Sequence, residues 1–398
     1  MISRIEKKIL GYIEDHIDVL FFAIMTLLTL LVRYCLFGII SKDFIESLEP
    51  WFNHIKDLGW NGAMTTQVGN YNVPYQIIVN ILAHIPGLEI VTLYKLVSVA
   101  FDYLLAFSCV LFVKRVLGKS DRKVLAAVFL GTLFLPTVIF NSSAWAQCDS
   151  IYVSFIILAL VFLYENKFAR AFILLGLSFS FKLQAIFIIP FFLYWYFSKK
   201  NFSLLYFVLV PLTDIVLCLP AILCGRSLMS TFEVYLWQSQ YYDSMALSAL
   251  NFWQFMGGED DAFIPLRNFA VVFTAALLGA GLYLFMKTKG KDLKDPAVFL
   301  QTALWTMFTC FMFLPAMHER YSYGVEILFL LLVVLGMKRY SVFFIVSQMD
   351  GLVRYGGYLF GNGYDKRIWA VINILLYMAV TYDFVISPYL KQYRSKLD

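Results

Sequence analysis

Apolar segments long enough to cross a lipid bilayer recur along the whole chain and alternate with short basic loops. The first covers about residues 19–37, close to the roughly 20 residues that a membrane helix requires. Of the 398 residues, 61% are hydrophobic and only 15% are charged, which is too little charge for a water-soluble domain of this length. We therefore predict one all-α membrane domain over residues 1–398, with no separate soluble domain.

The basic residues predict the orientation of the chain. Arg4, Lys7 and Lys8 precede the first span, so we expect a cytoplasmic N-terminus and an extracytoplasmic loop after that span. Acidic residues between 14 and 18, and the lack of a small-residue cleavage site, favour an uncleaved span over a signal peptide. The net charge of +5 therefore reports orientation, and no nucleic-acid partner is expected. The six cysteines lack CxxC spacing and are expected to be packing residues.

The alternation predicts a polytopic bundle of about twelve transmembrane helices with both termini in the cytoplasm. Residues 169–197 form too long an apolar stretch for one helix, so we expect two short spans that meet at Lys182 on the extracytoplasmic side. Residues 76–88 are too short to span and are expected to form an interfacial or re-entrant helix. Two long extracytoplasmic loops are expected at 38–75 and 224–263, the second with an acidic run at 259–261.

The loop at 38–75 has the density of acids, amides and aromatic residues that a reaction site needs. Asp43 lies a few residues beyond the first span and Glu46 follows three residues later, so a helical start would place both on one face. Pro50 can begin or break a helix, and Trp51 suits the headgroup level of a bilayer. On this stretch alone, a solvated loop anchored by interfacial aromatic residues is an equally good explanation.

Four compact polar groups are predicted on this same side of the membrane, each at or next to a helix end. Each group has a structural explanation of its own, since Asp149 can cap a helix and Lys182 can reach water along an apolar surface. Arg320 can likewise pair with Glu319 or with a lipid phosphate. Together they describe a site for an anionic, lipid-linked substrate and a hydroxyl group. The groups are Asp43 with Glu46; Trp145, Gln147 and Asp149; Lys182 with Gln184; and His318, Glu319 and Arg320.

These residues resemble the motifs of a known enzyme family. Asp43 followed by Glu49, Pro50 and Trp51 is similar to the first outer loop of GT-C glycosyltransferases. The resemblance becomes sharper toward bacterial mannosyltransferase-like proteins related to the second mannosyltransferase of GPI-anchor assembly. It rests there on residues 70–75 (NYNVPY), 145–149 (WAQCD), 182–184 (KLQ) and 318–321 (HERY). Ala146 stands where glycine is common in the family, and the last two predicted spans carry no matching motif.

The resemblance implies an inverting hexosyltransferase of a bacterial plasma membrane. It would move a mannose-like or glucose-like sugar from a polyprenyl-phosphate donor to an extracytoplasmic glycan or lipid-linked acceptor. Asp43 is the expected base, because an ionised carboxylate can take the proton of the acceptor hydroxyl. Lys182, His318 and Arg320 are the expected ligands of the donor phosphate. Acceptor-binding or orienting roles fall to Glu46, Trp145, Gln147, Asp149, Gln184, Glu319 and Tyr321.

No cofactor is expected for this reaction. The first loop contains no DxD motif, so a divalent metal is compatible with the site but is not required by its motifs.

The alternative is a twelve-span transporter or flippase of lipid-linked sugars. Ionisable residues inside the predicted spans would mark an ion path in such a protein. Asp350 and Arg354 are four residues apart and are expected to form a structural pair, whereas Asp102 and Lys95, seven apart on one face, stay open. A transporter needs polar groups near the bilayer midplane, often with repeats, but here they crowd one face and no repeat is visible. The other ionisable residues in apolar segments are Arg33, Asp214 and Glu326.

Overall fold

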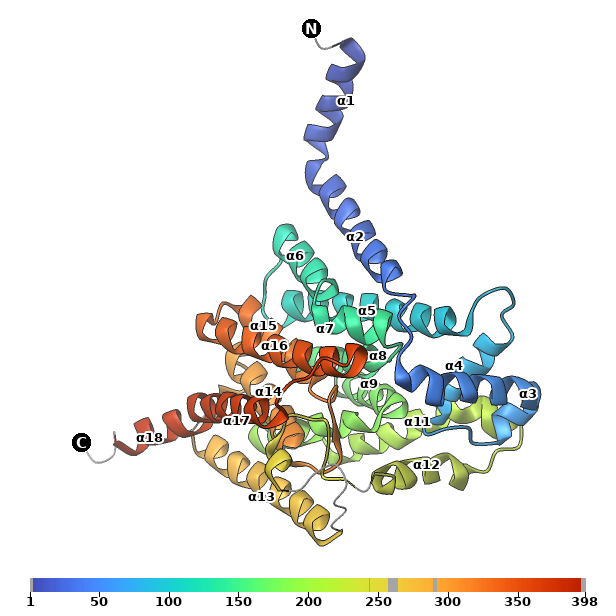
Figure 1. The fold of residues 1–398 in the computed structure, drawn as a ribbon. Coiled ribbons are helices and arrows are strands. Elements are labelled where there is room, and N and C mark those ends of the chain that lie inside the picture. The colour runs from blue at the N-terminus through green and yellow to red at the C-terminus, as the bar shows by residue number, and fades with distance from the viewer. Residues whose placement is uncertain (1–2, 243, 257–263, 289–291, 395–398) are drawn as a thin grey trace.

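The computed structural model describes residues 3–242, 244–256, 264–288 and 292–394, and most of them are helical (Figure 1). This confirms the predicted all-α class. The predicted acidic run at 259–261 lies outside the described residues. The longer helices in the first half are α1 (Arg4–Asp15), α2 (Ile17–Cys35), α3 (Glu49–Thr65), α4 (Val73–Ala83), α5 (Ile90–Arg115), α6 (Arg122–Leu133), α7 (Pro136–Ile139), α8 (Asp149–Tyr164), α9 (Phe168–Phe181) and α10 (Ile189–Lys199).

The second half continues the helical pattern and adds one small sheet. Its helices are α11 (Leu209–Leu223), α12 (Leu228–Gln240), α13 (Ile264–Thr288), α14 (Pro296–Phe313), α15 (Tyr323–Leu335), α16 (Lys338–Phe360), α17 (Lys366–Thr381) and α18 (Ser387–Arg394). The strands β1 (Ala246–Leu247) and β2 (Met317–His318) pair in parallel. Short π-helical or 3₁₀ turns are η1 (Phe44–Leu48), η2 (Phe140–Ala144), η3 (Leu183–Ile188), η4 (Leu204–Val208), η5 (Phe252–Phe255) and η7 (Tyr382–Ile386).

Within the described residues, six helical segments are long and apolar enough to cross a membrane, or up to seven if the bent pair of α6 with α7 and η2 is one span. They are α2, α5, α13, α14, η4 with α11, and α17 with its continuation to Leu390. The helices at several other predicted spans are shorter, with 16 residues in α8, 14 in α9 and 13 in α15. The structure therefore supports a membrane protein, while the number of twelve spans stays a prediction.

The short helices lie inside the bundle. α8 packs between α5 and α9, and residues on all of its sides are buried by protein. A helix enclosed in this way contacts other side chains and not lipid, so bilayer thickness does not set its length. In contrast, α1 and α2 extend away from the body of the molecule (Figure 1), and only 11% of the apolar window of α2 is buried.

The helix break that was predicted at Lys182 is confirmed. α9 ends at Phe181, Lys182 takes an extended conformation with φ −148° and ψ 133°, and the 3₁₀ turn η3 begins at Leu183. Lys182 is thereby released from helical geometry, and its side chain can turn toward groups on other helices.

The first predicted loop is largely helical. After η1, helix α3 covers much of the stretch 38–75 and packs against α4. The short apolar helix expected at 76–88 begins earlier, at Val73, with Pro74 in its first turn, and it ends at Ala83. Proline is tolerated in the first turn because no helical hydrogen bond is required of its nitrogen there. The second predicted loop, 224–263, contains α12, β1 and η5.

Candidate functional site

Asp43 stands at the start of the helical stretch that follows the first long helix. Ser41 begins this stretch, because its hydroxyl accepts a hydrogen bond from the Phe44 amide at 3.2 Å and donates one to the Trp145 carbonyl at 3.3 Å. Ser41 thus joins the first polar segment to the second. The Asp43 side chain is about one third exposed, at 32%. It is the most open carboxylate of the cluster described below.

The segment from Trp145 to Asp149 presents its N–H groups to Asp43. The Trp145 indole donates to Asp43 Oδ2 at 2.9 Å, and the Gln147 amide donates to the same oxygen at 3.1 Å. The π-helical turn η2 precedes this segment, and Ala146 has a φ of +62°. Glycine adopts this left-handed conformation without strain and alanine does not, which is a physical reason for a preference for glycine at this position.

Asp149 forms an ion pair with Lys182, which lies at the break between α9 and η3. Lys182 Nζ lies 2.5 Å from Asp149 Oδ1, and both side chains are buried. The other oxygen, Oδ2, accepts a hydrogen bond from Asn141 Nδ2 at 2.7 Å and lies 3.6 Å from Arg320 Nε. The Asp149 carboxylate therefore draws together cations from two segments that are far apart in the sequence.

The segment from His318 to Arg320 is held in place by the small sheet of β1 and β2. Pairing of β1 with β2 ties the second long loop to His318, and the Ala316 amide donates to the Met245 carbonyl at 3.0 Å. Arg320 Nη1 then reaches Glu319 Oε1 at 3.0 Å and Asp43 Oδ2 at 4.0 Å. The segment from 318 to 320 thus lies next to Asp43, the base expected in the first loop.

Arg320 and Glu319 both stay charged in this setting. Burial alone would raise the pKa of the Glu319 carboxyl, but contacts with His318 and the positive charge of Arg320 outweigh burial and lower the pKa to about 2. Burial alone would lower the pKa of Arg320, but Glu319, Asp149 and Asp43 raise it well above its ordinary value. The cluster therefore contains fixed charges at neutral pH.

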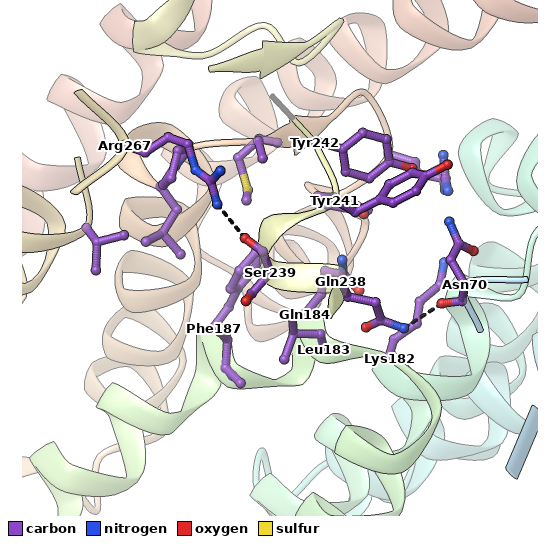
Figure 2. Close-up of a pocket in the computed structure, with 18 of the residues that line it drawn as sticks. Asn70, Lys182, Leu183, Gln184, Phe187, Gln238, Ser239, Tyr241, Tyr242 and Arg267 are labelled. Carbon is purple, nitrogen blue, oxygen red and sulfur yellow. Dashed lines mark hydrogen bonds between the residues drawn. The ribbon is translucent and has the colours of Figure 1, made fainter. Parts of the chain in front are cut away.

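A pocket of about 250 Å³ opens beside these charges (Figure 2). Four of the predicted site residues line it, namely Lys182, Gln184, Arg320 and Tyr321. The close-up shows that Gln238, at the C-terminal end of α12, and Tyr242, just beyond that end, form another part of the wall. Asp43 does not line the pocket. It lies next to the wall, since Arg320 is shared and the wall residue Tyr71 donates to Gln147 at 3.2 Å.

Two predicted site residues lie elsewhere. Glu46 is exposed and pairs with Lys42 at 3.7 Å. Glu46 does not line the pocket, and its expected role beside Asp43 stays a prediction. His318 faces Glu319 at 3.7 Å and packs edge-on against the Tyr242 ring, and it does not line the pocket with Lys182 and Arg320. Its contacts fit an orienting role toward Glu319 better than direct contact with a ligand.

Sequence reasoning missed the contribution of α16. Tyr358 Oη donates to Asp43 Oδ1 at 2.5 Å, and its ring stacks on Trp145 with centroids 4.2 Å apart. One turn earlier, Tyr355 Oη accepts from Asn141 at 3.3 Å and its ring packs edge-on against Trp145. These tyrosines belong to no local motif, so only the tertiary structure relates them to Asp43.

The other buried charges form separate structural networks. Arg33 of α2 pairs with Asp102 at 3.0 Å, and Lys95 donates to carbonyls just beyond the end of α2, such as Ile39 O at 2.6 Å. Lys95 and Asp102, seven residues apart in α5, therefore have different partners. Asp214 accepts a hydrogen bond from Tyr235 at 3.0 Å, which joins α11 to α12.

The pair that was predicted in the eleventh span is confirmed. Arg354 Nη2 lies 2.8 Å from Asp350 Oδ2, as the spacing of four residues predicted, and it also lies 3.1 Å from Glu326 Oε1. All three side chains are buried. An ion path was the other explanation offered for such charges, and the observed pairing favours a structural role for this set.

Among the described residues, no three His, Cys, Asp or Glu side chains converge in a way that would hold a metal ion. The sequence matches no protein-family model, and a search of curated proteins finds no relative. The family resemblance therefore rests on the motif residues, and the activity is argued below from the geometry of the site.

Proposed function

We propose that the protein is an inverting hexosyltransferase of the membrane. It transfers a mannose-like or glucose-like sugar from a polyprenyl-phosphate donor to a glycan or lipid-linked acceptor. One observation carries the proposal: an accessible carboxylate, Asp43, lies 4.0 Å from Arg320, which lines one pocket together with a second cation, Lys182. Base and cations are the two kinds of group that this transfer needs.

The donor phosphate binds at the cationic side of the pocket. Lys182 and Arg320 are paired with Asp149 and Glu319, so the phosphate enters by exchanging with these carboxylates as the partner of the cations. Arg320 offers a planar set of N–H groups that suits phosphate oxygens, and Lys182 adds a point charge. Arg320 Nε is buried and has no hydrogen-bond partner among the described residues, with Asp149 Oδ2 3.6 Å away, so this N–H can turn to a phosphate oxygen.

The chemical step is a single displacement at the anomeric carbon. The acceptor O–H bond breaks as its proton moves to Asp43, and the acceptor oxygen forms the new bond to the anomeric carbon. The bond from that carbon to the phosphate oxygen breaks, and the phosphate leaves with the electron pair. In this proposal the acceptor lies at the partly exposed Asp43 and the phosphate at Lys182 and Arg320, so that acceptor and leaving group are on opposite faces of the anomeric carbon. Attack from the opposite face inverts the configuration.

The remaining site residues have supporting roles in this proposal. Trp145 and Gln147 hold Asp43 through its Oδ2. Gln184 and Tyr321 line the pocket and contribute polar contacts to the sugar. We place this site on the extracytoplasmic face of a bacterial plasma membrane, with both termini of a twelve-span bundle in the cytoplasm, because each inner loop expected from the sequence is basic.

Purified protein in lipid nanodiscs, supplied with polyprenyl-phosphate mannose or glucose and an alkyl hexoside as probe acceptor, tests the proposal. We expect release of free polyprenyl phosphate together with a disaccharide product of inverted configuration. A lipid flippase would instead move the labelled donor between the leaflets of a vesicle and leave its phosphate–sugar bond intact. Translocation without release would contradict the proposal.

A further inference from the structure

We infer that Tyr358 is the positioning residue that orients the Asp43 carboxylate for proton transfer, an inference that rests on the proposed function. The two residues are far apart in the sequence, but the Tyr358 hydroxyl donates a hydrogen bond to Asp43 Oδ1 at 2.5 Å. It comes from the last turns of α16, a helix in which the sequence carries no recognisable motif.

The hydrogen bonds of Asp43 distinguish its two oxygens. Oδ2 accepts the N–H groups of Trp145 and Gln147, at 2.9 and 3.1 Å, and has Arg320 at 4.0 Å. A carboxylate oxygen has two lone-pair positions, so these two donors occupy Oδ2. Among the described residues, Oδ1 accepts only the Tyr358 hydroxyl, which leaves one of its lone-pair positions open. The proton of the acceptor hydroxyl therefore goes to Oδ1.

Two donors on one oxygen do not fix the plane of a carboxylate. Trp145 and Gln147 hold Oδ2 in place, but the group can still turn about that atom and swing Oδ1 away from the acceptor. The Tyr358 bond holds the second oxygen and thus fixes the plane. Proton transfer needs the base within hydrogen-bond reach of the hydroxyl, and small misplacements of reacting groups reduce rates strongly.

α16 is itself anchored to the segment that carries Arg320. Asp350, Arg354 and Tyr358 are spaced four residues apart and lie on one face of the helix. Arg354 Nη2 donates to Ser322 Oγ at 2.7 Å and to Glu326 Oε1 at 3.1 Å, just after the 318–320 segment. One face of α16 therefore contacts Asp43 through Tyr358 and, one turn earlier, contacts the start of α15 through Arg354.

The Trp145 ring links the two halves of the site. Tyr358 stacks on this ring with an interplanar angle of 16°, and the Arg320 guanidinium lies over it, 5.4 Å from the centroid. Removal of the Tyr358 hydroxyl alone leaves the stacked ring, so Tyr358→Phe isolates the hydrogen bond from the packing. Tyr358 does not line the pocket beside Lys182 and Arg320, so this change leaves donor binding intact.

The experiment compares the wild type, Tyr358→Phe and a matched control, Tyr340→Phe, in the release of polyprenyl phosphate from polyprenyl-phosphate hexose. Tyr340 is buried in the same helix about five turns earlier, and its hydroxyl accepts a hydrogen bond from Gln301 at 2.9 Å. A hydrogen bond to a charged group corresponds to about ten- to a hundredfold in rate. We expect Tyr358→Phe to lose kcat by that factor with the KM of the donor within twofold, and Tyr340→Phe to keep both.

The thermal unfolding temperature of each variant is measured alongside. A Tyr358→Phe protein with wild-type kcat, or with a kcat raised because a less stabilised carboxylate is more basic, overturns the positioning role. A loss of activity that follows a lowered unfolding temperature equally in both tyrosine variants also overturns it. If the wild type itself releases no polyprenyl phosphate, the proposed function fails, and this role fails with it.

Discussion

Replacement of Arg320 by lysine separates the proposed phosphate contact from a simple structural ion pair. The guanidinium reaches three carboxylates at once, with Nη1 3.0 Å from Glu319 and 4.0 Å from Asp43, and Nε 3.6 Å from Asp149. A lysine ammonium keeps the charge but is a single point on a flexible chain, so it can approach only one of these groups closely. The planar fork that suits a phosphate is lost.

The size of the effect follows from the contacts that lysine cannot make. Each charge-assisted hydrogen bond is worth about 1.5–3 kcal/mol, and one such bond to the phosphate corresponds to roughly a ten- to more than a hundredfold loss in kcat/KM. Both an increased donor KM and a lowered kcat are expected, because the bond strengthens as charge develops on the leaving phosphate. Stability changes less, because the buried carboxylates still face a positive charge.

The assay is the release of free polyprenyl phosphate at a series of donor concentrations, with thermal unfolding recorded on the same samples. Arg115→Lys is the matched control, since Arg115 forms a partly exposed pair with Glu165 at 3.3 Å and lies outside the site. The control is expected to retain kcat/KM within twofold. If Arg320→Lys keeps wild-type kcat/KM and loses only thermal stability, Arg320 is a structural partner of Glu319 and the phosphate assignment is wrong.

Three further predictions concern orientation, pH and metal. The first uses a background without the accessible Cys35 and Cys224. There, a cysteine at exposed Asn362 should react with an impermeant thiol reagent in intact cells, and a cysteine at exposed Ser120 should not. Labelling at Ser120 alone would reverse the predicted topology. Glu319 has a pKa lowered from 4.5 to about 2, so its ionic contribution to stability is full above pH 4.5 and is lost as the pH falls toward 2. The unfolding temperature of Glu319→Gln should therefore lie below that of the wild type at pH 7 and approach it at pH 3, whereas a constant gap would exclude an ionised Glu319. Finally, EDTA should leave turnover within twofold, and a complete loss that Mg²⁺ or Mn²⁺ restores would make a metal part of the site.

Features that depend on local periodicity could be predicted from the sequence. The Asp350–Arg354 pair follows from a spacing of four residues in a helix, and the break at Lys182 follows from an apolar stretch too long for one span. The meeting of Asp43, Asp149 and Arg320 was expected because the alternation of spans placed their segments on one side, and the observed distances bear this out.

Features that depend on tertiary packing could not be predicted from the sequence. Tyr358 reaches Asp43 across most of the chain, and no pattern around residue 358 indicates this partner. Arg33 and not Lys95 pairs with Asp102, because the choice depends on how α2 docks against α5. The number of membrane spans also stays a prediction, since hydropathy does not distinguish a helix surrounded by lipid from one enclosed by other helices, such as α8.

The turnover of Asp43→Asn tests the central claim most directly. Asparagine keeps the shape of the side chain but cannot take the acceptor proton, and general base catalysis typically contributes about 10²–10⁴-fold. The matched control is Asp57→Asn, which changes an exposed carboxylate in the neighbouring helix α3. The account predicts that purified Asp43→Asn folds as the wild type does and releases polyprenyl phosphate at least a hundredfold more slowly, while Asp57→Asn is unchanged. More than a tenth of wild-type turnover in Asp43→Asn would show that Asp43 is not the base.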